Sequence, residues 1–515
     1  MADFQRLDRR GFLKLGGAGL AGLGLAGTGL VAPRASFAQA AEAKGTPTRV
    51  IFMVSDGMSM GVVSLAEQLA RRARGKGTAW AELLQDPNVP RGFFETHSLT
   101  GLVTDSAAGG VAWSTGSRCL NGVLNFLPDG TKLSTIAEVL GEKGVRIGLV
   151  TTTRVTHATP ASFAAHEQSR ENEDAIAPQY LDRVDVILGG GRGNFDPGRR
   201  KDKADVVAKY KEAGYTFAAN KSEMAGFAGK KKLLGLFSGS HVPFTIDHMH
   251  DEKLQDEVPT LAEMTQAALD ALDDSPNGFL MQVEGGRVDH AAHGNDATGL
   301  IWDQVAFDDA IRVALAYQEK RPDTLIVLTT DHGNANPGLF GISGGGGESY
   351  GGSNAAFEKL LEARGSYGRA QGTLDDIRKA SGTVSAKDVA DVVQELAAVS
   401  LFENEAEALA KLANREIVPN WNRSLGGFSG LFGQIMANYC GIAFLSSTHT
   451  EDYALVTAIG PGQEHFDKLQ PNTAAYDIIT KFFGATHKNP SMTFEEAQKY
   501  ADASPARGEG DAHWA

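Results

Sequence analysis

The chain has 515 residues, of which 42% are hydrophobic and 22% charged, a composition that is ordinary for a globular protein with a large buried core. Its formal net charge of −14 disfavours nucleic acid and anionic lipid as partners, because both bind to basic surfaces. A small anionic ligand would need a local reversal of charge, which bound divalent cations usually supply.

The first 40 residues have the organisation of a targeting segment. Arg9 and Arg10 lie in the run DRRGFLKLG, which is followed by a glycine-rich, weakly apolar stretch at 15–31 and by the sequence A-Q-A at 38–40. This order resembles a twin-arginine signal peptide and predicts export to the periplasm or the exterior. The apolar stretch has about 17 residues, fewer than the roughly 20 that span a bilayer, so no stable membrane association is expected.

The chain has only two cysteines, Cys119 and Cys440. A low count is typical of a protein that folds in the cytosol before twin-arginine export and has little use for disulfides. Their spacing does not decide whether they pair, because pairing depends on the separation of their Cα atoms.

Beyond the targeting segment, short apolar runs rich in β-formers alternate with segments of helical periodicity. The runs lie at 49–54, 146–152, 184–188, 278–283 and 324–329, and two crossover helices are predicted at 259–272 and 299–317. This alternation predicts an α/β fold with a central, mostly parallel sheet flanked by helices.

Acidic residues follow three of these runs. Asp56 follows the first, Glu284 the fourth, and Asp331 with His332 the fifth. One acidic residue after a strand is usually a helix cap. Because ligands of open α/β sheets bind outside the carboxyl ends of the strands, three such positions indicate a shared site.

The pattern changes at about 339–444, which is predicted to be an inserted helical and irregular subdomain within a catalytic domain at 41–515. It begins with the run SGGGGESYGGS and continues with a helix in which valines and leucines form an apolar stripe behind the N-cap Ser385. The stripe is interpreted as core packing. A lid, a dimer contact and decoration remain open as roles for the insertion.

The segment VTDSAAGGVAWSTG, at 103–116, places Ser106 at the start of a helix rich in small residues. Unpaired N–H groups and the helix dipole favour negative charge there, so the Ser106 hydroxyl is a candidate nucleophile. Asp105 or Ser106 taken alone could equally be an N-cap.

Two further segments supply candidate ligands. In VEGGRVDHAAH, Glu284, Asp289 and His293 combine oxygen and nitrogen donors, and the Asp-x-x-x-His spacing puts two of them within one helical turn. In HATPASFAAHEQSR, Thr159 offers an oxygen for a hard cation and Arg170 a planar fork for phosphate.

Together with VSDGMS, LGGGR, TTDHGNA and STHTEDY, these segments resemble the alkaline phosphatase family over residues 50–462. The resemblance implies hydrolysis of phosphate monoesters through a phosphoserine, with two zinc ions and one magnesium ion; a homodimer is left open. It implies that Ser106 is the nucleophile and that Arg170, oriented by Asp105, binds the phosphate. It also implies three metal sites. Asp289, His293 and His449 would bind one zinc; Asp56, Asp331 and His332 would bind the second zinc; and Asp56, Thr159 and Glu284 would bind magnesium.

Two positions depart from the best-known enterobacterial form of the family. His157 and His290 stand where that form carries aspartate and lysine near the magnesium and the phosphate, as in animal and some marine bacterial relatives. Imidazole suits zinc better than magnesium, so the third metal is left open between the two ions.

Three functions other than phosphatase activity are consistent with parts of this pattern. A sulfatase needs a Cys- or Ser-x-Pro-x-Arg element, whereas Ser106 is followed by Ala-Ala-Gly. A phosphodiesterase of the same superfamily typically lacks the third metal, which Thr159 and Glu284 would hold here. A non-catalytic phosphate- or metal-binding protein would not need Ser106 as a nucleophile. The sequence does not identify the physiological ester.

Overall fold

The computed structural model describes residues 45–343 and 350–503. The predicted signal peptide at 1–40 and part of the glycine-rich run lie outside the described residues, so predictions about them stay predictions. Among the helices that are described, none combines the length and the apolar character that a bilayer crossing requires.

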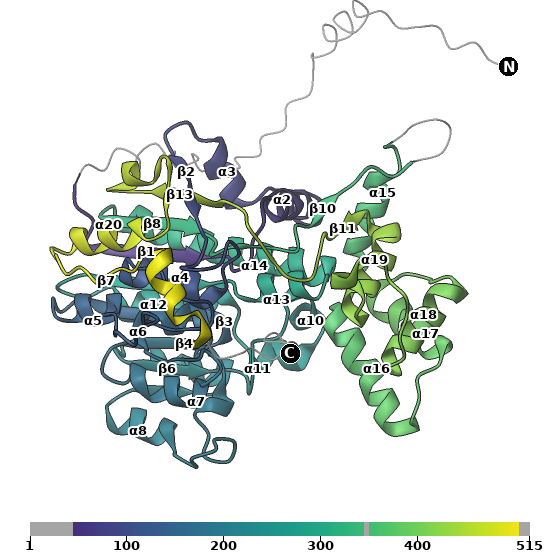
Figure 1. The fold of residues 1–515 in the computed structure, drawn as a ribbon, viewed down its shortest axis with the longest axis horizontal. Coiled ribbons are helices and arrows are strands. Elements are labelled where there is room, and N and C mark those ends of the chain that lie inside the picture. Colours follow the sequence, from purple (N-terminus) through teal and green to yellow (C-terminus); the bar gives the residue numbers. More distant parts are fainter. Residues whose placement is uncertain (1–44, 344–349, 504–515) are drawn as a thin grey trace, which may run out of the picture. The chain divides into compact units, whose positions relative to one another are not determined.

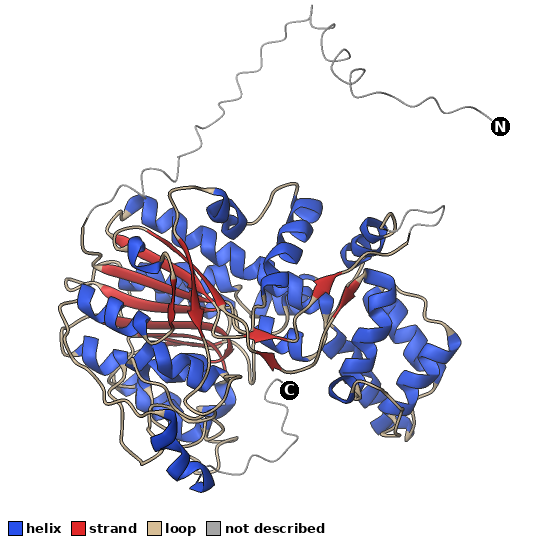
Figure 2. Ribbon diagram, turned by 45° about the horizontal axis from the view of Figure 1, so that its top comes forward, coloured by secondary structure: helices blue, strands red, loops and turns tan. Residues whose placement is uncertain are grey.

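The described residues contain one large sheet, in which ten strands lie side by side (Figure 2). In spatial order they are β14 (Leu469–Pro471), β2 (Arg91–Glu95), β13 (Ala454–Ile459), β8 (Thr324–Thr329), β1 (Arg49–Val54), β7 (Phe279–Glu284), β3 (Arg146–Arg154), β4 (Val186–Gly190), β6 (Leu233–Leu236) and β5 (Thr216–Ala218). From β8 to β5 all neighbours are parallel, and β13 pairs antiparallel with both β8 and β2. The predicted fold class is therefore confirmed.

Helices cover both faces of this sheet, as Figures 1 and 2 show. One face carries α4 (Ser106–Thr115), α5 (Ile136–Gly141), α6 (Ala158–Ala164) and α20 (Ala474–Phe482). The other carries α2 (Met60–Arg74), α3 (Ala79–Gln85), α12 (Leu261–Leu272) and α14 (Ala297–Lys320). Shorter helices between strands are α7 (Glu173–Ile176), α8 (Val206–Glu212), α9 (Lys221–Met224), α10 (Thr245–Met249), α11 (Glu252–Glu257), α13 (Arg287–His293) and, near the carboxyl end, α21 (Phe494–Ala497).

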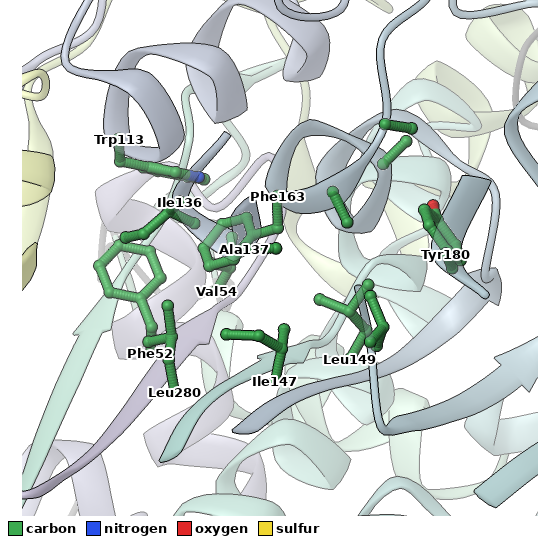
Figure 3. Packing of buried hydrophobic residues seen from close by; sticks show 14 of the residues in the cluster. Phe52, Val54, Trp113, Ile136, Ala137, Ile147, Leu149, Phe163, Tyr180 and Leu280 are labelled. Carbon is green, nitrogen blue, oxygen red and sulfur yellow. The ribbon is translucent and has the colours of Figure 1, made fainter. Parts of the chain in front are cut away.

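The central strands are buried on both faces, which explains why they are continuous apolar runs in the sequence. Every residue of Val50 to Val54 is fully buried. Alternate side chains of β1, including Phe52, pack against Trp113 of α4 and Phe163 of α6, with ring centroids 5.2 and 6.1 Å from Phe52 (Figure 3). The intervening side chains of β1 point to the opposite face of the sheet and are also fully buried, so the strand contributes to two layers of core.

The five predicted strands and both crossover helices are present; the strands at 49–54 and 324–329 have their predicted ends, and the other elements have shifted ends. The predicted helix at 259–272 begins instead at Leu261, because Thr260 is its N-cap and forms a reciprocal capping box with Glu263. Within the ten-stranded sheet, five strands were not predicted: β2, β5, β6, β13 and β14. Most are short or lie towards the edges, where alternation or partial exposure weakens the apolar signal.

Two short strands bracket a helical segment. β10 (Gly338–Leu339) pairs antiparallel with β11 (Ile442–Ala443), so the chain leaves and returns at one place. Between them lie α15 (Ser353–Glu358), α16 (Tyr367–Ser381), α17 (Ala386–Ala397), α18 (Glu403–Ala413) and α19 (Phe428–Cys440). Helices α16 to α19 enclose a hydrophobic cluster of their own, which includes the predicted stripe on α17 behind the N-cap Ser385. Cys119 and Cys440 are both buried and free, which settles the pairing left open above.

Candidate active site

The carboxyl ends of four neighbouring strands meet at one level of the sheet. In the order β8, β1, β7 and β3, Val54 is in register with both Thr329 and Glu284, and Glu284 with Thr151. Asp56 and Asp331 therefore emerge beside Glu284, as predicted from the positions of the three acids after their strands. Glu284 is the last residue of its strand rather than the first after it.

The loop after β1 approaches helix α13 closely. Gly57 has φ +65°, and a Cβ at this position would lie 2.4 Å from Oδ1 of Asp289. Its N–H donates to Oδ1 of Asp331 at 3.1 Å. Glycine is required here both for the backbone conformation and for the space.

Ser106 is the first residue of α4 and is 1% exposed. Asp105 is the N-cap, and its carboxylate accepts from the N–H of Ala108 at 3.0 Å and of Gly122 at 2.9 Å. The Ser106 hydroxyl oxygen lies 3.3 Å from Nε2 of His332. Asp105 is therefore the N-cap, as one interpretation of this motif predicted, and Ser106 lies at the helix N-terminus, the position that the other interpretation requires.

Arg170 is buried beside this helix end. Its Nη1 donates to Oδ2 of Asp105 at 3.1 Å, and its Nη2 lies 2.9 Å from Nε2 of His157. Burial by itself lowers the pKa of Arg170, but the carboxylates of Asp105, Glu171 and Asp56 together outweigh it and the net pKa is raised. The guanidinium is thus a fixed cation next to the Ser106 hydroxyl.

Helix α13 presents Asp289 and His293 one turn apart, with His449 facing them. Nε2 of His293 lies 3.4 Å from Asp289 and 3.0 Å from Nε2 of His449. The Nδ1 atoms bond to backbone carbonyls, that of His293 to Ser447 and that of His449 to Thr104, each at 2.8 Å. These bonds orient both Nε2 atoms toward Asp289, as the outer contacts of metal-bound histidines usually do.

A second group of donors lies deeper. Nε2 of His332 is 3.1 Å from Oδ2 of Asp331 and 3.7 Å from Oδ1 of Asp56, and all three side chains are fully buried. Donor atoms within 4.8 Å of one another occur in the set Asp56, Asp331 and His332 and in the set Asp289, His332 and His449. His332 therefore belongs to both donor sets, and in the set with Asp289 and His449 it stands where the sequence predicted His293.

The third set consists of Asp56, His157 and Glu284, again with donor atoms within 4.8 Å of one another. The hydroxyl of Thr159 donates to Asp56 at 3.3 Å. Burial, reinforced by the Asp331 carboxylate, raises the pKa of Asp56, and burial raises the pKa of Glu284 to about 7. Carboxylates this close and this buried repel one another unless a proton or a cation lies between them.

A second observation supports metal binding by these donor sets. Oδ1 of Asp56, Oε1 of Glu284 and Nδ1 of His157 are buried and have no hydrogen-bond partner among the described residues. Buried polar atoms are ordinarily paired. Carboxylate oxygens and imidazole nitrogens in these combinations suit zinc, and the carboxylate and hydroxyl set suits magnesium.

Sequence reasoning missed two side chains of this region. His241 lies with its ring centroid 4.3 Å from that of His290 and 5.7 Å from that of His157. Nη1 of Arg154 is 2.6 Å from His241 Nε2, and Arg154 also bonds to Glu173. Arg154 is the last residue of β3, so the search for polar residues at the carboxyl ends of strands would have found it. No signal in the sequence marks His241.

A pocket of about 440 Å³ opens over this arrangement. Its lining includes Asp105, Ser106, His157, Arg170, Asp289, His290, His293 and His449. The remaining predicted site residues do not line the pocket; they are Asp56, Thr159, Glu284, Asp331 and His332. The structure thus brings all predicted site residues to one place, with a hydroxyl, a guanidinium and metal-type donors facing one cavity.

Comparisons with known proteins agree with this arrangement. A profile of the family described as alkaline phosphatase matches residues 48–484. Alkaline phosphatase 4 of Bacillus subtilis is 30% identical over 450 residues, which cover 84% of this chain and 88% of that protein. Alkaline phosphatase 3 of the same organism is 34% identical over 307 residues, covering 57% and 63%. The crystal structure of Thermus thermophilus alkaline phosphatase is similar with a TM-score of 0.82 and 33% identity, covering 90% of this chain and 97% of that one.

Proposed function

Because the chain belongs to the alkaline phosphatase family and is a phosphoric monoester hydrolase, we propose that it acts through a phosphoserine on Ser106, with two zinc ions and one magnesium ion at the site. The observation that carries the proposal is the position of Ser106 at the N-terminus of α4, in one pocket with Arg170 and the donors of α13. A helix N-terminus and a guanidinium both favour the dianionic phosphate there.

Within the proposal, each side chain near Ser106 has a separate task. Ser106 attacks phosphorus, and the alcohol oxygen leaves on the opposite side, as an in-line displacement requires. Arg170 neutralises the phosphoryl oxygens that lie between these two positions. Asp105 holds Arg170 by their ion pair and leaves its remaining N–H groups for the substrate.

Three donor sets would hold the metals. Asp289, His293 and His449 would hold one zinc, Asp56, Asp331 and His332 the second, and Asp56, Thr159 and Glu284 the magnesium. When bound, these ions lower the pKa of hydroxyl groups and neutralise charge on phosphoryl oxygens. His157, placed with Asp56 and Glu284, offers a nitrogen donor to the third set and weakens the preference of this set for magnesium over zinc.

The proposal extends to export. The pair Arg9 and Arg10 supports twin-arginine transport to the periplasm or the exterior. Two free, buried cysteines are what a chain that folds in the reducing cytosol would carry.

The test of the nucleophile is Ser106→Ala, assayed with zinc and magnesium on a phosphate monoester and by trapping labelled phosphate at acidic pH. We expect loss of the covalent phosphoprotein and a fall in kcat of at least about a thousandfold, with an unchanged circular dichroism spectrum. Ser114→Ala is the matched control, since Ser114 is buried on the same helix but does not line the pocket. Labelled phosphate that still attaches to Ser106→Ala would assign the nucleophile elsewhere.

A further inference from the structure

A second cleft of about 430 Å³ lies beside the active site, between helix α13 and the helical segment that follows β10. Its lining contains four aromatic residues, Phe244, Tyr367, Phe428 and Phe432. The centroids of Tyr367 and Phe432 are 4.5 Å apart, and Phe428 meets Phe432 edge-on at 5.7 Å. This lining suits an aromatic or apolar ligand, because aromatic rings pair face to edge or offset with other rings.

Two glycines on helix α16 leave space in the cleft. The positions of α16 that line the cleft are 367, 368, 371, 372 and 375, which lie on one helical face, and two of them are glycine. A Cβ at Gly372 would meet nothing within 4 Å, and at Gly368 the nearest atom would be 3.5 Å away. Neither glycine is needed for φ or for packing, although glycine inside a helix is less stable than alanine. We read these glycines as maintaining the volume of the cleft.

The cleft adjoins the active-site pocket at His290, which lines both cavities. Helix α13 gives Asp289, His290 and His293 to the catalytic pocket and His290, Ala291 and Gly294 to the cleft. The two cavities therefore lie against adjacent faces of one short helix, with His290 at the shared edge. His290 is held in place by its Nδ1, which lies 2.7 Å from Nη1 of Arg287. Arg287 in turn stacks on Phe244, its Cζ 3.7 Å from the ring centroid.

We propose that this cleft binds the alcohol half of the substrate and that the enzyme prefers phosphate monoesters of extended aryl alcohols. The inference rests on the proposed function, because in-line attack by Ser106 sends the leaving oxygen to the side of phosphorus away from Ser106, and residues of α13 line both the pocket and the cleft. A ring joined to that oxygen by a short linker passes His290 and lies against Phe428 and Phe432.

The experiment compares two substrates of similar leaving-group acidity, phenyl phosphate and 4-benzylphenyl phosphate, on the zinc- and magnesium-loaded enzyme. Gly372→Leu fills the cleft, and Thr373→Leu is the matched control, on an exposed position of α16 that does not line it. We expect Gly372→Leu to lower kcat/KM for 4-benzylphenyl phosphate about tenfold, mainly through KM, while phenyl phosphate changes less than about twofold. Thr373→Leu should change neither substrate.

Gly372→Ala distinguishes an effect of the residue on the cleft from an effect on the stability of the fold. It should raise the midpoint of thermal unfolding, because alanine favours the helix, and leave phenyl phosphate hydrolysis unchanged. Equal loss on both substrates in Gly372→Leu, or no loss on either, would overturn the assignment of the cleft. A wild-type enzyme that hydrolyses neither monoester would instead contradict the proposed function, and the substrate preference with it.

Discussion

Glu284→Gln tests the electrostatics of the buried site in the metal-free protein. Glu284 is fully buried, and burial raises the pKa of its carboxyl from an ordinary 4.5 to about 7. A raised carboxyl pKa means that the folded state binds the proton of Glu284 more tightly than the unfolded state does. This proton therefore stabilises the folded state fully below pH 4.5, and the stabilisation is lost as the pH rises through 7. Since a tenfold change in proton affinity corresponds to ~1.4 kcal/mol, the loss amounts to ~3 kcal/mol.

The comparison with the variant isolates this effect, because buried histidines titrate in the opposite sense. The pKa of His449, for example, is lowered to about 3 by burial and by His332, so its contribution to stability grows as the pH rises to 6.5. Glutamine has the same shape as glutamate and no titration.

The assay is urea-induced unfolding of both proteins in excess chelator at pH 5, 6, 7 and 8. We expect the free energy of unfolding of the wild type to fall relative to Glu284→Gln by ~3 kcal/mol across this range. Adding zinc and magnesium should reverse the order, because the carboxylate then faces a cation. A difference between the two proteins that does not vary with pH would refute the argument.

Three further outcomes are expected. His157→Asp should lower the magnesium concentration needed for half-maximal thermal stabilisation at fixed zinc, since it adds an anionic oxygen donor; an unchanged midpoint would place His157 outside the third site. Gly110→Ala should cost ~1–3 kcal/mol in urea unfolding, because its Cβ would lie 2.4 Å from the Ser162 hydroxyl, whereas Gly141→Ala, also in a helix but with nothing within 4 Å, should be neutral or slightly stabilising. Arg9→Lys with Arg10→Lys should leave the precursor in the cytoplasm on cell fractionation; normal periplasmic yield would indicate another export route.

The local signals in the sequence were strongest where a segment is buried on all sides. The strands Arg49–Val54 and Thr324–Thr329 were predicted with their observed ends, because both faces are covered and the apolar run is unbroken. The family motifs then placed every candidate site residue, and the structure gathers them at one edge of the sheet. Their roles in catalysis and metal binding remain proposals.

The sequence by itself determined the fold class, the family and the candidate site residues, because buried strands, helix caps and ligand spacings are local patterns. Only the tertiary structure decided that β8, β1, β7 and β3 are neighbours, that His332 belongs to two donor sets, and that His241 joins His157 and His290. The cleft between α13 and α16 likewise brings together segments about 80 residues apart. Such features depend on pairing and packing between distant segments, which leave no periodic trace in either segment alone.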